Sequence, residues 1–110
     1  MSKPVMVVWS NPSDPAREDE FNEWYDGVHV PDVLKIPGIL SCTRYKLSDT
    51  QFGPVETPGT YVAYYEVDPE KLAGIPAAFG EAFVAGELPM SDVMAPGPIV
   101  LLEAVSEHRP

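Results

Sequence analysis

Cysteine and basic residues are scarce in this sequence of 110 residues, and it has no long hydrophobic run. Its single cysteine, Cys42, cannot form a disulfide within the chain, and a lone thiol is typical of a reducing compartment. The 7 Lys and Arg against 17 Asp and Glu give a net charge of −10, which disfavours binding to nucleic acid and to anionic membranes. The apolar stretch over residues 5–9 is too short for a signal peptide or for a membrane span of about 20 residues. We therefore expect a cytoplasmic protein without a zinc site, because no Cys/His cluster has the required spacing.

The length predicts a single domain over residues 1–110, because domains commonly contain roughly 100–150 residues. Runs of β-branched and aromatic residues predict strands, and residues that form turns separate them. The expected strands cover residues 5–9, 39–47, 61–67 and 99–102, the last one buried, with loops over 48–60 and 89–98.

Two helices are expected between these strands. The first covers residues 16–28, where apolar side chains follow a helical spacing, and it breaks near His29 because Pro31 disfavours helical backbone before it. The second begins after Asp68–Pro69, which resemble a helix cap and a first helical position, and ends near Gly86. Two residues within it are expected to kink or divide it, Pro76 and Gly80.

The element order β-α-β-β-α-β predicts an α+β, ferredoxin-like fold, in which a four-stranded antiparallel sheet carries both helices on one face. Two helices cover only one face of such a sheet, so the other face contacts water, a ligand or another sheet. The strands over residues 5–8 and 99–102 are apolar on both faces. We therefore expect a homodimer in which two sheets pack face to face.

The residues best suited to acid–base chemistry lie where the first helix is expected to end. Histidine exchanges protons near neutral pH, and Tyr25 lies four positions before His29 while Asp32 follows three positions after it. Tyr25 and Trp24 offer flat apolar walls for a ring-shaped substrate. Each residue also has a structural interpretation: Trp24 and Tyr25 as core residues, Asp32 as a first-turn acid, and His29 as a cation at a helix end.

The second strand and the second half of the chain provide further candidates. Arg44 either pairs with Glu66 across the sheet or binds an anionic group of a substrate. Tyr45 and Tyr65 are expected to share the face opposite Arg44, because side chains alternate along a strand. Four apolar residues line a cavity or pack in the core, namely Phe79, Phe83, Met90 and Met94.

The stretch over residues 21–32, FNEWYDGVHVPD, followed by Pro37–Gly38 and by residues 43–45, resembles the EthD-like members of the dimeric α+β-barrel superfamily. Residues 61–70 also resemble the third strand and second-helix start of that group. Its members include polyketide cyclases, lactone isomerases, cofactor-free monooxygenases and haem-degrading or peroxidase-type enzymes. The resemblance implies a pocket between sheet and helices in each subunit, with His29 at the site.

These patterns together predict a small enzyme without cofactor that acts on a cyclic, aromatic or polyketide-like carbonyl compound as a cyclase, isomerase or retro-aldol lyase. In this hypothesis His29 is the general acid or base, Asp32 orients it, and Tyr25 donates to the developing oxyanion. The expected substrate-binding residues are Trp24, Arg44, Tyr45, Tyr65 and Phe83. The alternatives are a cofactor-free monooxygenase, a haem-type enzyme with His29 as ligand, and a small-molecule-binding accessory protein without catalysis.

Overall fold

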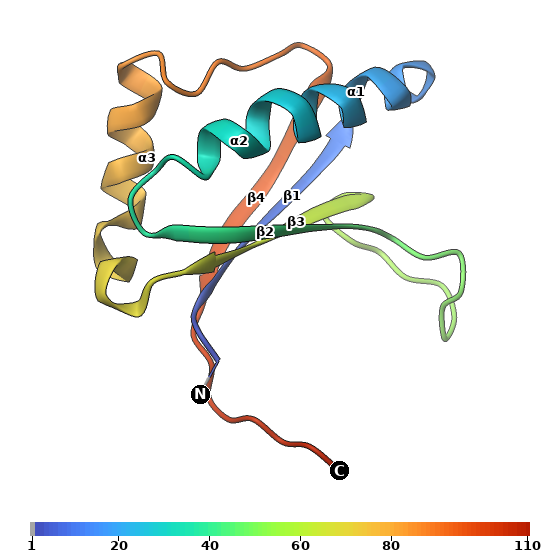
Figure 1. Cartoon of the computed structure of the whole chain (residues 1–110). Helices are drawn as coiled ribbons and strands as arrows, with labels where there is room; N and C mark the ends of the chain where they lie inside the picture. Colours follow the sequence, from blue (N-terminus) through green and yellow to red (C-terminus); the bar gives the residue numbers. More distant parts are fainter. Residues whose placement is uncertain (1) are drawn as a thin grey trace.

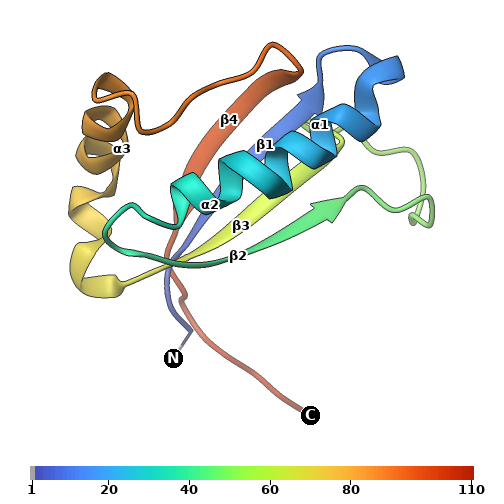
Figure 2. The ribbon, with the colours of Figure 1, turned by 45° about the horizontal axis from the view of Figure 1, so that its top comes forward.

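The computed structural model describes residues 2–110, which form a four-stranded antiparallel sheet in the order β2-β3-β1-β4. The strands are β1 (Val5–Pro12), β2 (Ile39–Lys46), β3 (Tyr61–Val67) and β4 (Met94–Leu102). β1 pairs with β3 and β4, and β3 also pairs with β2. All helices cover the same face of this sheet (Figures 1 and 2). The predicted ferredoxin-like α+β fold is therefore confirmed.

The first helix is continuous and does not break at His29, contrary to the prediction from Pro31. After the 3₁₀ turn Pro15–Arg17 it runs through α1 (Glu18–Trp24), a π-helical turn (Tyr25–His29) and α2 (Val30–Val33). Within the π-turn the Val30 N–H donates to the Tyr25 carbonyl, five residues back. A proline ring normally clashes with the carbonyl four residues before it, and the wider π-turn relieves that contact for Pro31. The helix therefore continues past the proline.

The second helix is divided, although at a different place from the one expected. A 3₁₀ segment, Pro69–Gly74, leads into α3 (Ile75–Val84), so that Pro76 lies in the first turn and Gly80 lies inside an unbroken helix. Proline is tolerated in a first helical turn because the N–H that it lacks has no partner there. Gly86, with φ +75°, follows the helix end as predicted. No helix among residues 2–110 is long and apolar enough to cross a membrane.

The last strand is longer and less buried than expected. β4 begins at Met94 and includes Pro96 and Pro98, which were predicted to belong to a loop. It is an edge strand whose register with β1 shifts between Pro96 and Ile99, and sheet edges and bulges are the places where strands tolerate proline. Its apolar end is 36–61% exposed over residues 99–102, because the face without helices is uncovered and the helices cover Ile99 and Leu101 only in part on the other face. The expectation of a buried last strand is therefore wrong for the single chain.

The core lies between the sheet and the helices. Phe21 and Tyr25 from the first helix pack against Tyr65 and Val67 of β3, and Ile75 of α3 closes one end. The turn before β2 brings α3 close to the sheet. There the Gly38 carbonyl accepts a hydrogen bond from the Asp68 N–H at 2.8 Å.

Gly38→Ala should lower the free energy of unfolding by about 2 kcal/mol, because Gly38 has φ +100° and side chains strain such backbone. An added Cβ would also lie 2.9 Å from the Ile75 Cδ1 and from the Lys71 Cβ. The matched control is Gly80→Ala, in which the added Cβ meets nothing within 4 Å. It should stabilise the helix by about 0.5–1 kcal/mol. Denaturant unfolding of both variants measures the difference, and equal midpoints would contradict this account.

Candidate functional site

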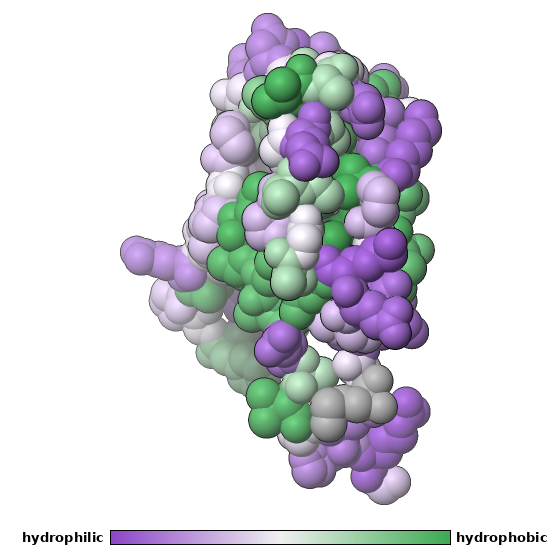
Figure 3. Space-filling view, turned by 90° about the vertical axis from the view of Figure 1, so that its left-hand side faces the viewer, coloured by the Kyte–Doolittle hydropathy of each residue, from purple (hydrophilic) through white to green (hydrophobic). Residues whose placement is uncertain are grey.

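A cavity of about 360 Å³ lies between the sheet and the helices. Its walls come from β1, the first helix, β3, α3, the loop after α3 and β4. They are mainly apolar, with Met6, Phe79, Phe83, Leu88, Met90 and Met94 among them. No charged side chain of the described residues lines it apart from the titratable imidazole of His29. Figure 3, seen from the side of α3, shows apolar residues gathered in the middle of this face.

Two of the predicted catalytic residues lie together at the cavity, one at each end of the π-turn. Tyr25 and His29 both line it, with ring centroids 4.9 Å apart and an interplanar angle of 75°. Trp24 stacks on the His29 ring at 4.9 Å and 21°. Trp24 does not line the cavity itself, so it contacts the imidazole and not the space beside it. The imidazole is therefore held between two aromatic rings.

The electrostatic surroundings of His29 favour its neutral form. Burial lowers the pKa of His29, the charge of Asp32 opposes this shift, and the charge of Arg44 adds to it. Its Nδ1 is fully buried and has no hydrogen-bond partner among the described residues. The unfolded chain, with a histidine pKa of about 6.5, binds the proton more readily, so this histidine reduces folding stability as the pH falls below that value. Near neutral pH the imidazole can therefore act as a base.

Asp32 does not orient His29 through a hydrogen bond, in contrast to the prediction. Its carboxylate lies 3.7 Å from the Lys35 Nζ and borders a different, polar surface hollow. Because α2 continues the first helix, Asp32 and His29 lie one turn apart without contact between their polar atoms. Asp32 affects His29 by charge alone.

Two tyrosine hydroxyls complete the polar lining of the cavity. The hydroxyls of Tyr25 and Tyr65 are buried close to each other, and neither makes a hydrogen bond of ordinary geometry within residues 2–110. Burial raises the pKa of both phenols, so they stay protonated and can donate. A buried donor without an acceptor costs about 1–3 kcal/mol, which a ligand oxygen would recover. Two tyrosines and one imidazole thus line otherwise apolar walls, with the tyrosine hydroxyls and the imidazole Nδ1 covered by neighbouring atoms.

Arg44 lies behind the cavity wall and does not line the cavity. Its guanidinium carbon is 4.2 Å from the centre of the Tyr25 ring. It donates to the Asp26 Oδ1 at 3.0 Å and to the Asn22 Oδ1 at 2.9 Å. The expected pair with Glu66 is wrong, because strand register places Glu66 on the opposite face of the sheet. The sequence could not show this pairing, since Asn22 and Asp26 lie on another element.

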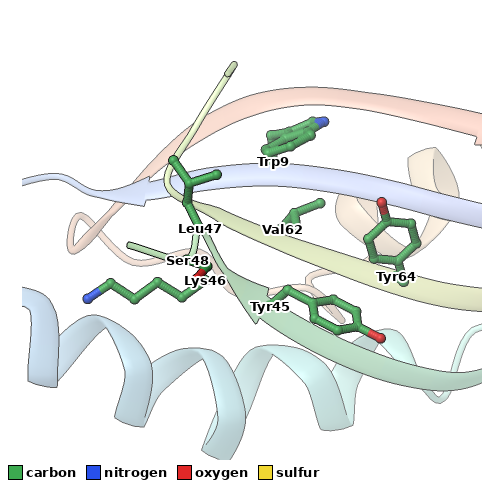
Figure 4. A pocket seen from close by; sticks show the side chains of 7 residues that line it. All are labelled: Trp9, Tyr45, Lys46, Leu47, Ser48, Val62 and Tyr64. Atoms are coloured by element: carbon green, nitrogen blue, oxygen red, sulfur yellow. The ribbon is translucent and has the colours of Figure 1, made fainter. Parts of the chain in front are cut away.

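The expected faces of the two tyrosines also need correction. Tyr65 pairs with Cys42 and shares the helix-covered face with Arg44, whereas Tyr45 lies on the other face and contacts Tyr64 at 5.4 Å. This uncovered surface, the outer face, carries an open hollow of about 430 Å³ (Figure 4). Its apolar members are Trp9, Tyr45, Leu47, Val62 and Tyr64. Phe83 lines the cavity, at its solvent-facing side, with 61% of its surface exposed.

No group of three or more His, Cys, Asp and Glu side chains is arranged to hold a metal ion within residues 2–110. Sequence reasoning missed several cavity residues on β1 and β4, including Met6, Val8 and Ile99. Strand alternation could have placed these residues on one face, but which face the helices cover depends on the pairing of distant strands.

Comparison with solved structures gives the same fold for three proteins. HapK from Hahella chejuensis has a TM-score of 0.59 at 14% identity, over 97% of both chains. An ethyl tert-butyl ether D (EthD) family protein from Bacillus halodurans C-125 has a TM-score of 0.55 at 20% identity, over 96% of this chain and 100% of that one. A protein from Shewanella loihica PV-4, provisionally described as a monooxygenase, has a TM-score of 0.59 at 19% identity, over 97% of this chain and 99% of that one.

The chain has the fold of these EthD-like α+β proteins. No protein-family model matches the sequence, and no curated protein matches it either. Identities of 14–20% support the fold and carry no information about the reaction. The chemistry therefore has to be argued from the residues at the cavity.

Tyr65→Phe should raise the free energy of unfolding by about 1 kcal/mol, because it removes a buried hydroxyl that has no partner. The matched control is Tyr61→Phe on the same strand and face. The Tyr61 hydroxyl donates to the Glu18 Oε2 at 2.5 Å and accepts from the Asn22 Nδ2 at 3.1 Å, so its loss should destabilise by about 1 kcal/mol. Thermal and denaturant unfolding compare the two, and destabilisation by both variants would show that the Tyr65 hydroxyl is satisfied.

Proposed function

We propose that the protein is an enzyme that moves a proton next to the carbonyl group of a cyclic, aromatic or polyketide-like compound, without a cofactor. One observation carries the proposal: an otherwise apolar cavity is lined by an imidazole and by two tyrosines whose buried hydroxyls make no hydrogen bond of ordinary geometry with the described residues. Buried polar groups in native proteins are normally satisfied, and exceptions often belong to functional sites. A ligand with a carbonyl oxygen would satisfy the hydroxyls and present an adjacent C–H bond to His29.

The proposed step begins when neutral His29 takes a proton from the carbon next to the carbonyl. The C–H electron pair moves into the carbon–carbon bond, and the carbonyl oxygen becomes an enolate oxygen. Tyr25 and Tyr65 donate hydrogen bonds to this oxygen as its negative charge develops. The enolate then closes a ring by attacking a second carbonyl, whose oxygen receives the proton from His29, or it is protonated again at another carbon. These outcomes correspond to a cyclase and an isomerase, and the reversed ring closure corresponds to a lyase.

The proposed substrate is uncharged where it enters the cavity. No arginine or lysine side chain among the described residues lines the walls, and Arg44 already has Asp26 and Asn22 as partners. A buried carboxylate or phosphate would have no counter-charge there, which is costly. The net charge of −10 adds a long-range repulsion of anions. A neutral ketone or quinone-like ring system fits these conditions.

His29→Ala should slow proton abstraction about 10²–10⁴-fold, the usual contribution of a positioned acid–base group. The assay follows exchange of the proton next to the carbonyl for deuterium by NMR, on neutral aromatic and polycyclic ketones that raise the melting temperature of the protein. His108→Ala, in the C-terminal tail, is the matched histidine control and should keep the full rate. Tyr25→Phe and Tyr65→Phe should each lose about 10²-fold or more through loss of an oxyanion donor.

The same experiment separates the alternatives. Full exchange in His29→Ala would contradict the assignment of the base. Ligand-dependent stabilisation without exchange in the wild-type protein would indicate a binding protein. Consumption of oxygen during turnover would indicate a monooxygenase, and an absorption band in the visible region that requires His29 would indicate haem.

The proposal includes a homodimer formed through the outer face. This surface carries no helix and is mostly apolar, with Glu66 as a charged residue on β3, and Tyr45 and Tyr64 are 53% and 38% exposed there. Packing against the same face of a second copy would remove these rings from water, at about 25 cal/mol for each Å² of apolar surface buried. The cavity lies on the other face, so each subunit would keep its own site.

Tyr64→Lys should convert the dimer into a monomer at micromolar concentration, because it places a charge in the middle of the apolar outer face. Val84→Lys is the matched control, since Val84 is 88% exposed on α3, away from that face. It should remain a dimer. Analytical ultracentrifugation gives the masses, and circular dichroism checks that both variants are folded. A monomeric wild-type protein would contradict the dimer.

A further inference from the structure

Arg44 is a cation enclosed by aromatic rings beneath the cavity wall. Only 14% of its side chain is exposed. Its guanidinium carbon lies 4.2 Å from the ring centre of Tyr25, 5.4 Å from that of Tyr61 and 5.5 Å from that of Phe21. A cation over an aromatic face at such distances is attracted by the ring, most strongly where water is excluded.

Two polar side chains of the first helix hold this guanidinium against Tyr25. Asn22 and Asp26 are four residues apart on the helix and on either side of Tyr25 in sequence, and each accepts from a different terminal nitrogen of Arg44. The planar fork of arginine allows both bonds at once, which a lysine could not reproduce. Arg44 of β2 therefore fixes the position of Tyr25 over the sheet.

We propose that Arg44 is a positioning residue of the cavity, which acts through the Tyr25 ring and by its charge and does not contact the ligand. It holds the Tyr25 hydroxyl in place for the ligand oxygen and disfavours the protonated form of His29. This inference rests on the proposed function, in which His29 is the base and Tyr25 is the oxyanion donor.

The charges around His29 support this role. Its own helix contributes Asp32, whose carboxylate favours the protonated imidazole, and Asp26, which is bound to Arg44. β2 contributes Arg44, which lowers the pKa of both His29 and Tyr25, and β3 contributes the neutral hydroxyl of Tyr65. The cavity walls from β1, α3 and β4 carry no charged side chain. Arg44 therefore opposes the effect of Asp32 on the imidazole, and Asp32 itself is paired with Lys35 at 3.7 Å.

A ligand-free NMR titration of the two histidines tests this coupling directly, with His108→Gln used to assign the signals. Arg44→Gln should raise the pKa of His29, because it removes the positive charge 4.2 Å from the centre of the Tyr25 ring, which itself lies 4.9 Å from that of the imidazole. Arg44→Lys keeps the charge and should leave the pKa near its wild-type value. The matched control is Lys46→Gln, on the same strand and face, where Lys46 pairs with Glu18 at 3.0 Å. It should leave the His29 titration unchanged.

The rate of deuterium exchange gives a second readout. Arg44→Gln should lower the rate constant about tenfold, which is equivalent to about 1.4 kcal/mol, with little change in KM. It should also shift the acid limb of the pH–rate profile to higher pH. Arg44→Lys should recover the pH profile while losing part of the rate, because it lacks the fork that fixes Tyr25. An unchanged His29 titration in folded Arg44→Gln would overturn the inference. If Arg44→Gln does not fold, an Arg44→Lys protein with wild-type rate and pH profile would overturn the positioning by the fork.

Failure of this inference is distinguishable from failure of the proposed function. If His29→Ala abolishes exchange while Arg44→Gln leaves the titration unchanged, the function stands and the role of Arg44 falls. If His29→Ala keeps full exchange while Arg44→Gln moves the titration, the base is wrong but the electrostatic coupling of Arg44 to His29 stands.

Discussion

The π-turn over Tyr25–His29 is the local constraint on which the candidate site depends. One extra residue in a helical turn changes which side chains lie above one another, and here it stacks Trp24 on His29, five residues later, while Tyr25 and His29 line the same cavity. The same wide turn accommodates Pro31, so that the helix reaches Val33 and covers more of the sheet. A regular α-helix through this segment would have met the proline clash and would have ended before the cavity was closed. The site and the length of the helix therefore have one cause.

The polar groups of the cavity also explain why stability and chemistry oppose each other here. Tyr25 and Tyr65 are among the most buried large side chains, and their rings contribute to the core. Their hydroxyls make no hydrogen bond of ordinary geometry within residues 2–110, although they lie close to each other, with Ser10 near Tyr25 and Cys42 near Tyr65. Phenylalanine at either position would pack equally well without that cost. The presence of two such hydroxyls in one cavity therefore favours a role toward a ligand oxygen over a role in packing.

Much of the fold could be predicted from local sequence patterns. The wrong predictions concern features that depend on which distant strands pair with each other. The strand over residues 61–67 and the element order could be predicted, since β-branched runs and turn residues carry them. The extent of β4 could not be predicted, because it contains Pro96 and Pro98, and a strand tolerates proline at a sheet edge or a bulge. Whether a strand lies at the edge depends on the topology of the whole sheet. The face of Tyr65 and the partner of Arg44 likewise depend on strand register. His29 was singled out from its neighbours in sequence, whereas its stacking on Trp24 needed the π-turn.

The distribution of charge connects the fold with the chemistry. The chain carries a net charge of −10, yet its one cation close to the cavity, among the described residues, is already neutralised by Asp26 and shielded by aromatic rings. An anion would therefore meet repulsion outside and find no free positive partner inside. The electric field of Arg44 is only partly cancelled at the imidazole, because Asp26 is 67% exposed and screened by water, whereas Arg44 is 14% exposed. The cavity thus excludes charged ligands, while the charge of Arg44 still acts on the imidazole of His29 and on the phenol of Tyr25. This combination suits proton transfer on a neutral molecule.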